Sequence, residues 1–192
     1  MPKAVEGSVI QMGITGKYVN PLDLKTEDVD VRDIAHHLGN QCRYSGAPSK
    51  HYSVAQHAVL CALEAERRGY SPDVVYTILH HDDAEAFLQD VARPLKEDPY
   101  FGKAYRGAEQ RAERVIAEAL SFIYPFPDVV KELDMILLAT ERRDIMPRDG
   151  LQWKILEGIV PLEKEVVPWG CGVGSNRFNV MHQRLVREGV AA

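Results

Sequence analysis

Hydrophobic residues recur at intervals of three and four positions along most of the chain, which is the spacing of one face of a helix. The pattern begins at Val31 and continues through Ile34 and Leu38, with Asp30 as the N-cap. The same spacing predicts helices over about 54–68, from 72 through the stretch 78–90, over 108–123 and over 127–147, with a short last helix near "NVMHQRLVRE". We therefore expect an all-α bundle of five or six helices.

Polar and breaker residues set the expected ends of these helices. "SVAQ" has the form of a capping box, in which Ser53 caps the helix and the Gln56 side chain reaches back, and Gly69 is a usual C-terminal residue. Ser71 followed by Pro72 predicts the start of the third helix, which would carry the polar run "HHDDAE". Pro125 is expected to end the fourth helix.

The two ends of the chain differ from this helical part. Near the N-terminus, "SVIQM" and "KYVN" have β-compatible residues separated by Gly13 and Gly16, so a small hairpin or an irregular arm fits. Beyond Pro147, "VPLEKEVVPWGCGVG" is rich in proline and glycine. We expect one domain over residues 1–192, with an N-terminal arm at 1–30, a helical core at about 31–147 and a loop-rich tail at 148–192.

Composition narrows the class of protein. A chain of 192 residues with 45% hydrophobic content can bury one sizeable core, and a net charge of -5 provides no broad basic field for duplex nucleic acid. Three widely spaced cysteines favour neither a disulfide framework nor a structural zinc knot. Because no long apolar run or signal peptide is evident, we expect a soluble, cytoplasmic protein without a membrane partner.

Ionisable side chains interrupt three of the predicted apolar helix faces. His57 shares a face with Leu60 and Cys61, while Asp82, next to His81, and Asp134 fall on the apolar faces of their own helices. Each has an ordinary alternative: a hydrogen-bonded core histidine, a solvated polar face or an interhelical salt bridge. Together they form a nitrogen and oxygen set suited to Zn²⁺, Co²⁺, Mn²⁺, Fe²⁺ or Ni²⁺ and poorly suited to Ca²⁺.

The order of these residues resembles a known signature. His57, then His81-Asp82, then Asp134 is similar to the H…HD…D pattern of the HD-domain phosphohydrolases, a helical superfamily. "HHDDAEAFLQDVARPLK" resembles the form H-D-x-x-E-x-x-x-x-D-x-x-x-P-x-K of a branch with bacterial 5'-deoxynucleotidases and phage deoxynucleoside triphosphate triphosphohydrolases, and "HYSVAQH" and "ATERRDIMP" also look like it. The resemblance covers Val31 to Pro147 and implies an HD-domain helical bundle.

The resemblance also implies roles for individual residues. His57, His81, Asp82 and Asp134 would hold one divalent transition metal, with Mg²⁺ as an alternative for a triphosphate substrate. Glu85 would steer the attacking water or protonate the leaving oxygen. The implied substrate-binding residues are Arg43 and Lys96, which would bind phosphate, and Asp90, which would lie near the sugar or the nucleophile. His80 and Asp83 are extra polar residues beside the motif.

The implied activity is hydrolysis of a deoxynucleotide by a metal-bound water. The substrate is either a monophosphate, which yields phosphate, or a triphosphate such as dATP, which yields polyphosphate. Dimers or hexamers are common in the family, so a homo-oligomer is implied. Two other classes stay open: a metal- and nucleotide-binding regulatory module with little catalysis, and a helical scaffold with buried salt bridges. Arg142 and Arg143 could reach a phosphate or pair with Glu141 and Asp144.

Overall fold

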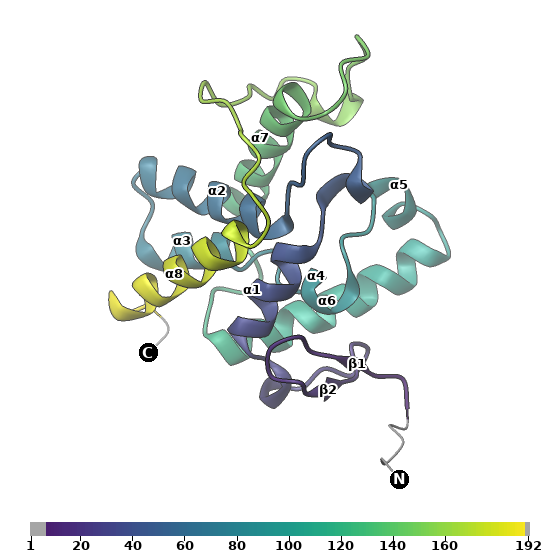
Figure 1. Ribbon diagram of the computed structural model, residues 1–192, viewed down its shortest axis with the longest axis vertical. Coiled ribbons are helices and arrows are strands. Elements are labelled where there is room, and N and C mark those ends of the chain that lie inside the picture. The colour runs from purple at the N-terminus through teal and green to yellow at the C-terminus, as the bar shows by residue number, and fades with distance from the viewer. Residues whose placement is uncertain (1–6, 191–192) are drawn as a thin grey trace.

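The computed structural model describes residues 7–190 and is mostly helical (Figure 1). A short antiparallel hairpin pairs Ile10 of β1 with Val19 of β2. Its bounds and those of the helices are β1 Ile10–Gln11, β2 Tyr18–Val19, α1 Val31–Asn40, α2 Val54–Arg67, α3 Pro72–Leu79, α4 Glu85–Leu88, α5 Arg93–Lys96, α6 Phe101–Leu120, α7 Asp128–Asp144 and α8 Val173–Arg187. The expected helical fold with a small β arm is confirmed within these residues, although it has eight α-helices rather than five or six.

The first two helices begin where their caps predict. The Asp30 side chain accepts a hydrogen bond from the Arg32 amide, and Ser53 Oγ accepts one from the Gln56 amide. The second half of the expected capping box is wrong. The Gln56 side chain instead donates to the Val167 carbonyl and accepts from the Trp169 amide, both at 2.8 Å. A tertiary contact with the segment before α8 therefore replaces the local one.

The third predicted helix does not continue through the polar run. α3 ends at Leu79, residues 80–84 form a turn, and α4 begins at Glu85. His80 Nδ1 lies 2.6 Å from Asp83 Oδ2, and a side-chain bond across three residues competes with the helical pattern. The backbone bonds here also span three residues, from the Asp83 amide to the His80 carbonyl and from the Glu85 amide to the Asp82 carbonyl. Asp82 is thus presented by a turn, not by a helix face.

Two other helix boundaries also differ from expectation. α6 starts at Phe101 and ends at Leu120, because Ser121 takes a left-handed conformation with φ of 58°, so Pro125 is not its end. α7 ends at Asp144, three residues before Pro147.

The expected loop-rich tail contains a fifteen-residue helix, α8, which packs against α1 and α2. Two glycines permit this close approach. A Cβ on Gly39 would lie 1.7 Å from Ser175 Oγ, and one on Gly174 would lie 2.6 Å from Ser53 Oγ. The apolar face of α8 buries Phe178, Met181 and Leu185, so the expectation of a loop-rich tail is wrong for residues 173–187.

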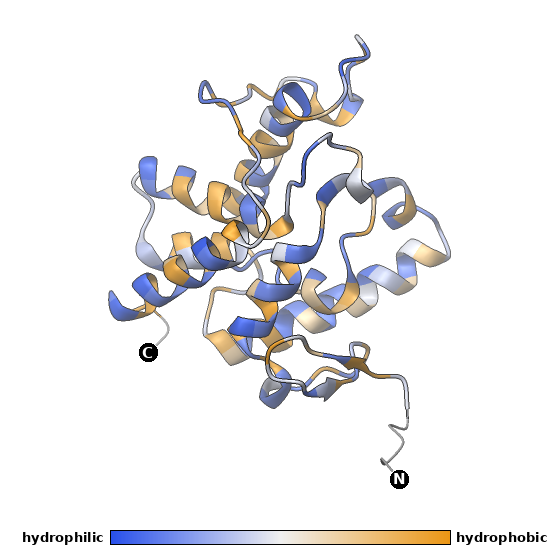
Figure 2. Cartoon of the chain, in the orientation of Figure 1, coloured by the Kyte–Doolittle hydropathy of each residue, from blue (hydrophilic) through white to orange (hydrophobic). Residues whose placement is uncertain are grey.

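Buried hydrophobic side chains form one cluster that runs from Met12 in the arm to Val190 after α8. Figure 2 shows the hydrophobic positions of the helices turned toward their neighbours and the hydrophilic ones toward the outside. Among the described residues, no helix has the length and apolar character needed to cross a membrane.

Candidate metal centre

His57 on α2 is fully buried and has polar partners on both ring nitrogens. Nδ1 lies 2.5 Å from Glu141 Oε1 on α7. Nε2 lies 3.2 Å from Asp134 Oδ1 and 3.8 Å from Asp82 Oδ2. An ionised carboxylate only accepts hydrogen bonds, so Glu141 favours the tautomer with the proton on Nδ1. The lone pair of Nε2 then points at two acids, which is an arrangement that needs a proton or a cation between them.

His81 presents its imidazole to the same place. Its Nδ1 donates to the Ile78 carbonyl at 2.7 Å, which leaves Nε2 as the acceptor or ligand atom. Nε2 is buried without a hydrogen-bond partner, although it lies 3.3 Å from Asp82 Oδ1. The rings of His57 and His81 are 5.4 Å apart between centroids. A buried nitrogen without a partner costs free energy that a bound cation would recover.

Donor atoms of His57, Cys61 and His81 lie within 4.8 Å of one another, close enough to share an ion. Cys61 is an addition to the predicted ligands, one helical turn after His57, and its Sγ lies 3.5 Å from His57 Nε2. With Asp82 and Asp134 the donors are nitrogen, oxygen and sulfur, which suits a divalent transition metal. The residues present therefore fit the implied metal, while its identity stays a prediction.

Glu141 is the functional residue that the sequence reasoning missed. Fully buried, it accepts hydrogen bonds from Tyr52 Oη at 2.7 Å, from Tyr44 Oη and from His57. The sequence pattern indicates it only as a partner for the neighbouring arginines. The spacing in the sequence could have identified it, because Glu141 follows Asp134 by seven residues, which is two turns along the same helix face. A carboxylate that orients a ligating imidazole is a common outer-shell partner of metal sites.

The arginine of the predicted set reaches the centre from the loop between α1 and α2. The Arg43 amide donates to the Tyr52 carbonyl at 2.9 Å, which fixes this loop beside the start of α2. Its guanidinium lies 3.4 Å from Asp82 Oδ2 and 3.4 Å from Glu141 Oε2. The following residue, Tyr44, has a left-handed conformation with φ of 57°. This conformation costs free energy in a residue other than glycine, and the hydrogen bond from Tyr44 to Glu141 offsets part of it.

A cavity of about 620 Å³ opens over this cluster, a size typical of small-molecule sites. Six of the eight predicted site residues line it: Arg43, Asp82, Glu85, Asp90, Lys96 and Asp134. His57 and His81 do not line it, but their Nε2 atoms lie 3.8 and 3.3 Å from the Asp82 carboxylate, which does. The structure therefore brings all eight predicted residues to one place.

Glu85 at the start of α4 is buried, and its Oε2 has no hydrogen-bond partner. Its other oxygen lies 3.5 Å from Lys96 Nζ, which also contacts Glu109 at 2.7 Å. Burial, and then the carboxylates of Asp82 and Asp90, raise the pKa of Glu85 well above its usual range. Asp90 is half-buried, and its amide donates to Gln41 Oε1 at 3.1 Å.

The pKa values of the two acids on α7 are shifted in the opposite direction from that of Glu85. Burial opposes ionisation of Glu141, but Arg43 and His57 outweigh it and lower the pKa of Glu141 to about 2. Burial likewise opposes ionisation of Asp134, yet the hydrogen bond to His57 and the nearby cations lower its pKa below the usual value. Glu85 thus tends to hold a proton while Asp134 and Glu141 tend to be anionic, which is the separation that acid catalysis beside a cation requires.

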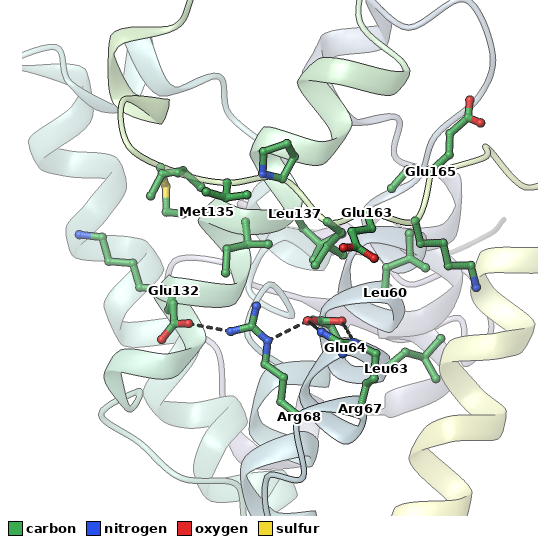
Figure 3. A pocket seen from close by; sticks show the side chains of 18 of the residues that line it. Leu60, Leu63, Glu64, Arg67, Arg68, Glu132, Met135, Leu137, Glu163 and Glu165 are labelled. Atoms are coloured by element: carbon green, nitrogen blue, oxygen red, sulfur yellow. Dashed lines mark hydrogen bonds and ion pairs between the residues drawn. The ribbon is translucent and has the colours of Figure 1, made fainter.

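A second cavity, of about 1240 Å³, lies between α2, α7 and the segment 158–169 (Figure 3). None of the predicted site residues lines it. Four of its ionic residues pair with one another: Glu64 with Arg67 and Arg68, and Arg68 with Glu132, as the dashed lines in Figure 3 show. The larger cavity therefore lacks the residues that could bind a metal or move a proton in the candidate site.

Arg142 and Arg143 take the structural role considered for them. Arg143 pairs with Asp144 at 2.6 Å, as expected, whereas Arg142 contacts Asp149 and the Pro147 carbonyl. Neither pairs with Glu141. Neither lines the cavity over the metal cluster.

Comparison with known proteins places the chain in a family without supplying an activity. Over 165 residues, which are 85% of this chain and 88% of the other, it is 37% identical to "Uncharacterized protein YfdR" of Escherichia coli strain K12. The chain belongs to the YfdR family. No family model matches this YfdR-family chain.

Proposed function

We propose that this YfdR-family protein is a metal-dependent phosphohydrolase that acts on deoxynucleotides. The observation that carries the proposal is the buried, unpartnered Nε2 of His81, which faces Asp82 beside His57. This cluster adjoins a cavity that is also lined by a buried acid, Glu85, and by four cationic side chains. The resemblance to the HD-domain phosphohydrolases supplies the reaction class, and the geometry is compatible with it.

The metal would be held by His57, His81, Asp82 and Asp134. A bound divalent transition metal lowers the pKa of water and polarises a phosphoryl oxygen. Cys61 is an alternative ligand. Like His57 it is fully buried and does not line the cavity, so the choice of the two carboxylates rests on the resemblance. Glu141 and the Ile78 carbonyl would orient the two imidazoles through their Nδ1 atoms.

Glu85 would move the proton. Its unpartnered Oε2 is free to meet a substrate oxygen or a water, and its raised pKa suits a group that donates a proton near neutral pH. Lys96 at 3.5 Å would stabilise the carboxylate left after donation. Arg43 and Lys96 would bind phosphate oxygens, and Asp90 would contact the sugar.

Part of the cavity lining favours a nucleotide over a bare phosphate ester. Trp153, Ile155 and Leu138 line the same cavity as the charged residues. The Trp153 ring lies 6.0 Å from the Tyr44 ring between centroids, and Tyr44 is next to Arg43. Aromatic side chains stack on bases of any sequence. We therefore infer that a base stacks on Trp153 while the phosphate binds the cationic residues of the same cavity.

The test is release of phosphate and of polyphosphate from the four dNMPs and four dNTPs with Co²⁺, Mn²⁺, Zn²⁺ or Mg²⁺. We expect turnover of one set, reduced about 10²–10⁴-fold in Glu85→Gln, with Glu118→Gln as a control on the exposed surface of α6. Turnover that Glu85→Gln leaves unchanged would refute the role of Glu85. Metal and nucleotide binding without any turnover would contradict the hydrolase and support a regulatory module.

A further inference from the structure

A second group of ionisable residues adjoins the metal centre but has no part in the proposed reaction. His80 and Asp83 flank the predicted ligands His81 and Asp82, and both are buried. The His80 ring packs against Phe122 and Phe178, and it meets His182 of α8 at 5.2 Å between centroids. Two residues that look superfluous in the motif therefore connect the turn to a helix about a hundred residues further along the chain.

The hydrogen bonds of this group form a directed chain. His80 Nδ1 lies 2.6 Å from Asp83 Oδ2, and His80 Nε2 lies 3.1 Å from His182 Nδ1. When Asp83 is ionised and His80 is neutral, Asp83 accepts from Nδ1–H of His80, and His80 Nε2 accepts from Nδ1–H of His182. Tyr76 Oη, 3.3 Å from the same His182 nitrogen, is a further polar neighbour. Within this chain Asp83 sets the tautomer of His80, and His182 supplies the donor for the nitrogen that is left without a proton.

The 80–84 turn is otherwise held by short-range bonds. The Asp83, Glu85 and Ala86 amides donate to carbonyls three residues earlier, at 3.3, 3.0 and 3.1 Å, and His81 Nδ1 donates to the Ile78 carbonyl at 2.7 Å. The contact between His80 and His182 adds a link from the turn to α8. The turn carries two of the predicted ligands, so a change in its conformation would move His81 Nε2 relative to His57. Outer-shell hydrogen bonds of this kind commonly affect metal affinity by 10–100-fold.

We propose that His182 is a positioning residue: through His80 and Asp83 it fixes the turn that presents His81 and Asp82, and so couples α8 to the metal centre. The proposal rests on the metal centre proposed above but not on hydrolysis. It assigns the two extra polar residues of the motif a role in holding the ligands.

The experiment compares two substitutions of similar size. His182→Asn keeps a donor at the position of Nδ1, whereas His182→Leu removes it; the half-buried position accommodates both. Two readouts are used: Co²⁺ affinity from its visible spectrum, and hydrogen exchange of the amides of residues 80–85 in the metal-free protein. In His182→Leu we expect about tenfold weaker Co²⁺ binding and about tenfold faster exchange, with His182→Asn within about threefold of the unsubstituted protein on both.

Leu185→Ala is the matched control, because Leu185 is buried on the same helix and its loss leaves the histidine pair in place. It should lower the melting temperature without changing Co²⁺ affinity. Equal effects of His182→Asn and His182→Leu, or an effect of Leu185→Ala as large as that of His182→Leu, would overturn the proposal. If the unsubstituted protein binds no Co²⁺, the metal centre fails while hydrogen exchange still tests the link.

Discussion

Replacing Glu141 by glutamine tests whether a buried carboxylate organises the candidate centre. In the structure Oε1 accepts from Tyr52 and His57, and Oε2 accepts from Tyr44 and lies 3.4 Å from Arg43 Nε. A glutamine oxygen in place of Oε1 keeps two of these bonds. Its amide nitrogen then faces the Arg43 guanidinium, so the substitution removes charge without changing shape.

The magnitude follows from the bonds that lose their charge. A hydrogen bond to a charged group contributes about 1.5–3 kcal/mol and a neutral one about 0.5–1.5 kcal/mol. The two bonds kept by the glutamine oxygen therefore weaken by about 1 kcal/mol each, and replacing the Tyr44 bond by a neutral one from the amide nitrogen to Tyr44 Oη costs about 1 kcal/mol more. Glu141→Gln should therefore lower the free energy of unfolding by about 3 kcal/mol. For a chain of this length, that corresponds to a fall in melting temperature of about 6–12 °C. Co²⁺ affinity should fall about 10–100-fold, because the imidazole of His57 loses its anionic partner.

The assay is thermal unfolding of the metal-free protein followed by a Co²⁺ titration. Glu132→Gln is the control on the same helix, since Glu132 is 53% exposed at its side chain and has one ion pair, with Arg68. It should change the free energy of unfolding by no more than about 1 kcal/mol. If Glu141→Gln has the same melting temperature as the unsubstituted protein and binds Co²⁺ equally well, the carboxylate does not organise the site.

Three further predictions concern the cavity and its surroundings. Trp153→Ala should raise the KM for the deoxynucleotide about tenfold but leave the KM for 2-deoxyribose 5-phosphate, which has no base, nearly unchanged. Trp153→Phe should change the KM for the deoxynucleotide little. Equal changes for both substrates in Trp153→Ala would exclude base stacking. Lys96→Met should lower kcat/KM about 10–100-fold, and a value near that of the unsubstituted enzyme would argue against phosphate binding by Lys96. Burial and then the Glu109 carboxylate raise the pKa of Glu113 to about 7 from 4.5, so its contribution to stability is complete below pH 4.5 and is lost as pH rises through 7. Unfolding from pH 5 to 8 should show a loss of about 2 kcal/mol that Glu113→Gln removes, and an equal pH dependence in both proteins would contradict this.

Local chemistry made part of the fold predictable. The caps Asp30 and Ser53 and the start at Pro72 are set by neighbouring residues, and these helix starts are as expected. The end of α3 was not predictable by periodicity, because the hydrogen bond between His80 and Asp83 competes with the helix. The Gln56 side chain and α8 were misjudged for another reason. Their partners lie more than a hundred residues away, or on helices that only the folded chain brings together.

The candidate site was predictable in its members more than in its arrangement. The buried acids and histidines could be chosen because charged residues on apolar helix faces are costly unless paired. Glu141 was missed since two adjacent arginines offered a simpler partner, although its spacing from Asp134 placed it on the same face. Cys61 resembled an ordinary core residue, and only the structure brings its sulfur near His57 and His81.

The central claim is that His57, His81, Asp82 and Asp134 hold one metal ion. The most direct measurement is the Co²⁺ content of the protein after reconstitution and removal of free metal, compared with that of His81→Ala, with the visible spectrum recorded on the same samples. We predict one ion per chain, almost none in the variant, and no intense sulfur-to-cobalt charge-transfer absorption, because the proposed ligand set does not include Cys61. A protein without stoichiometric metal, or a variant that retains it fully, would contradict the claim.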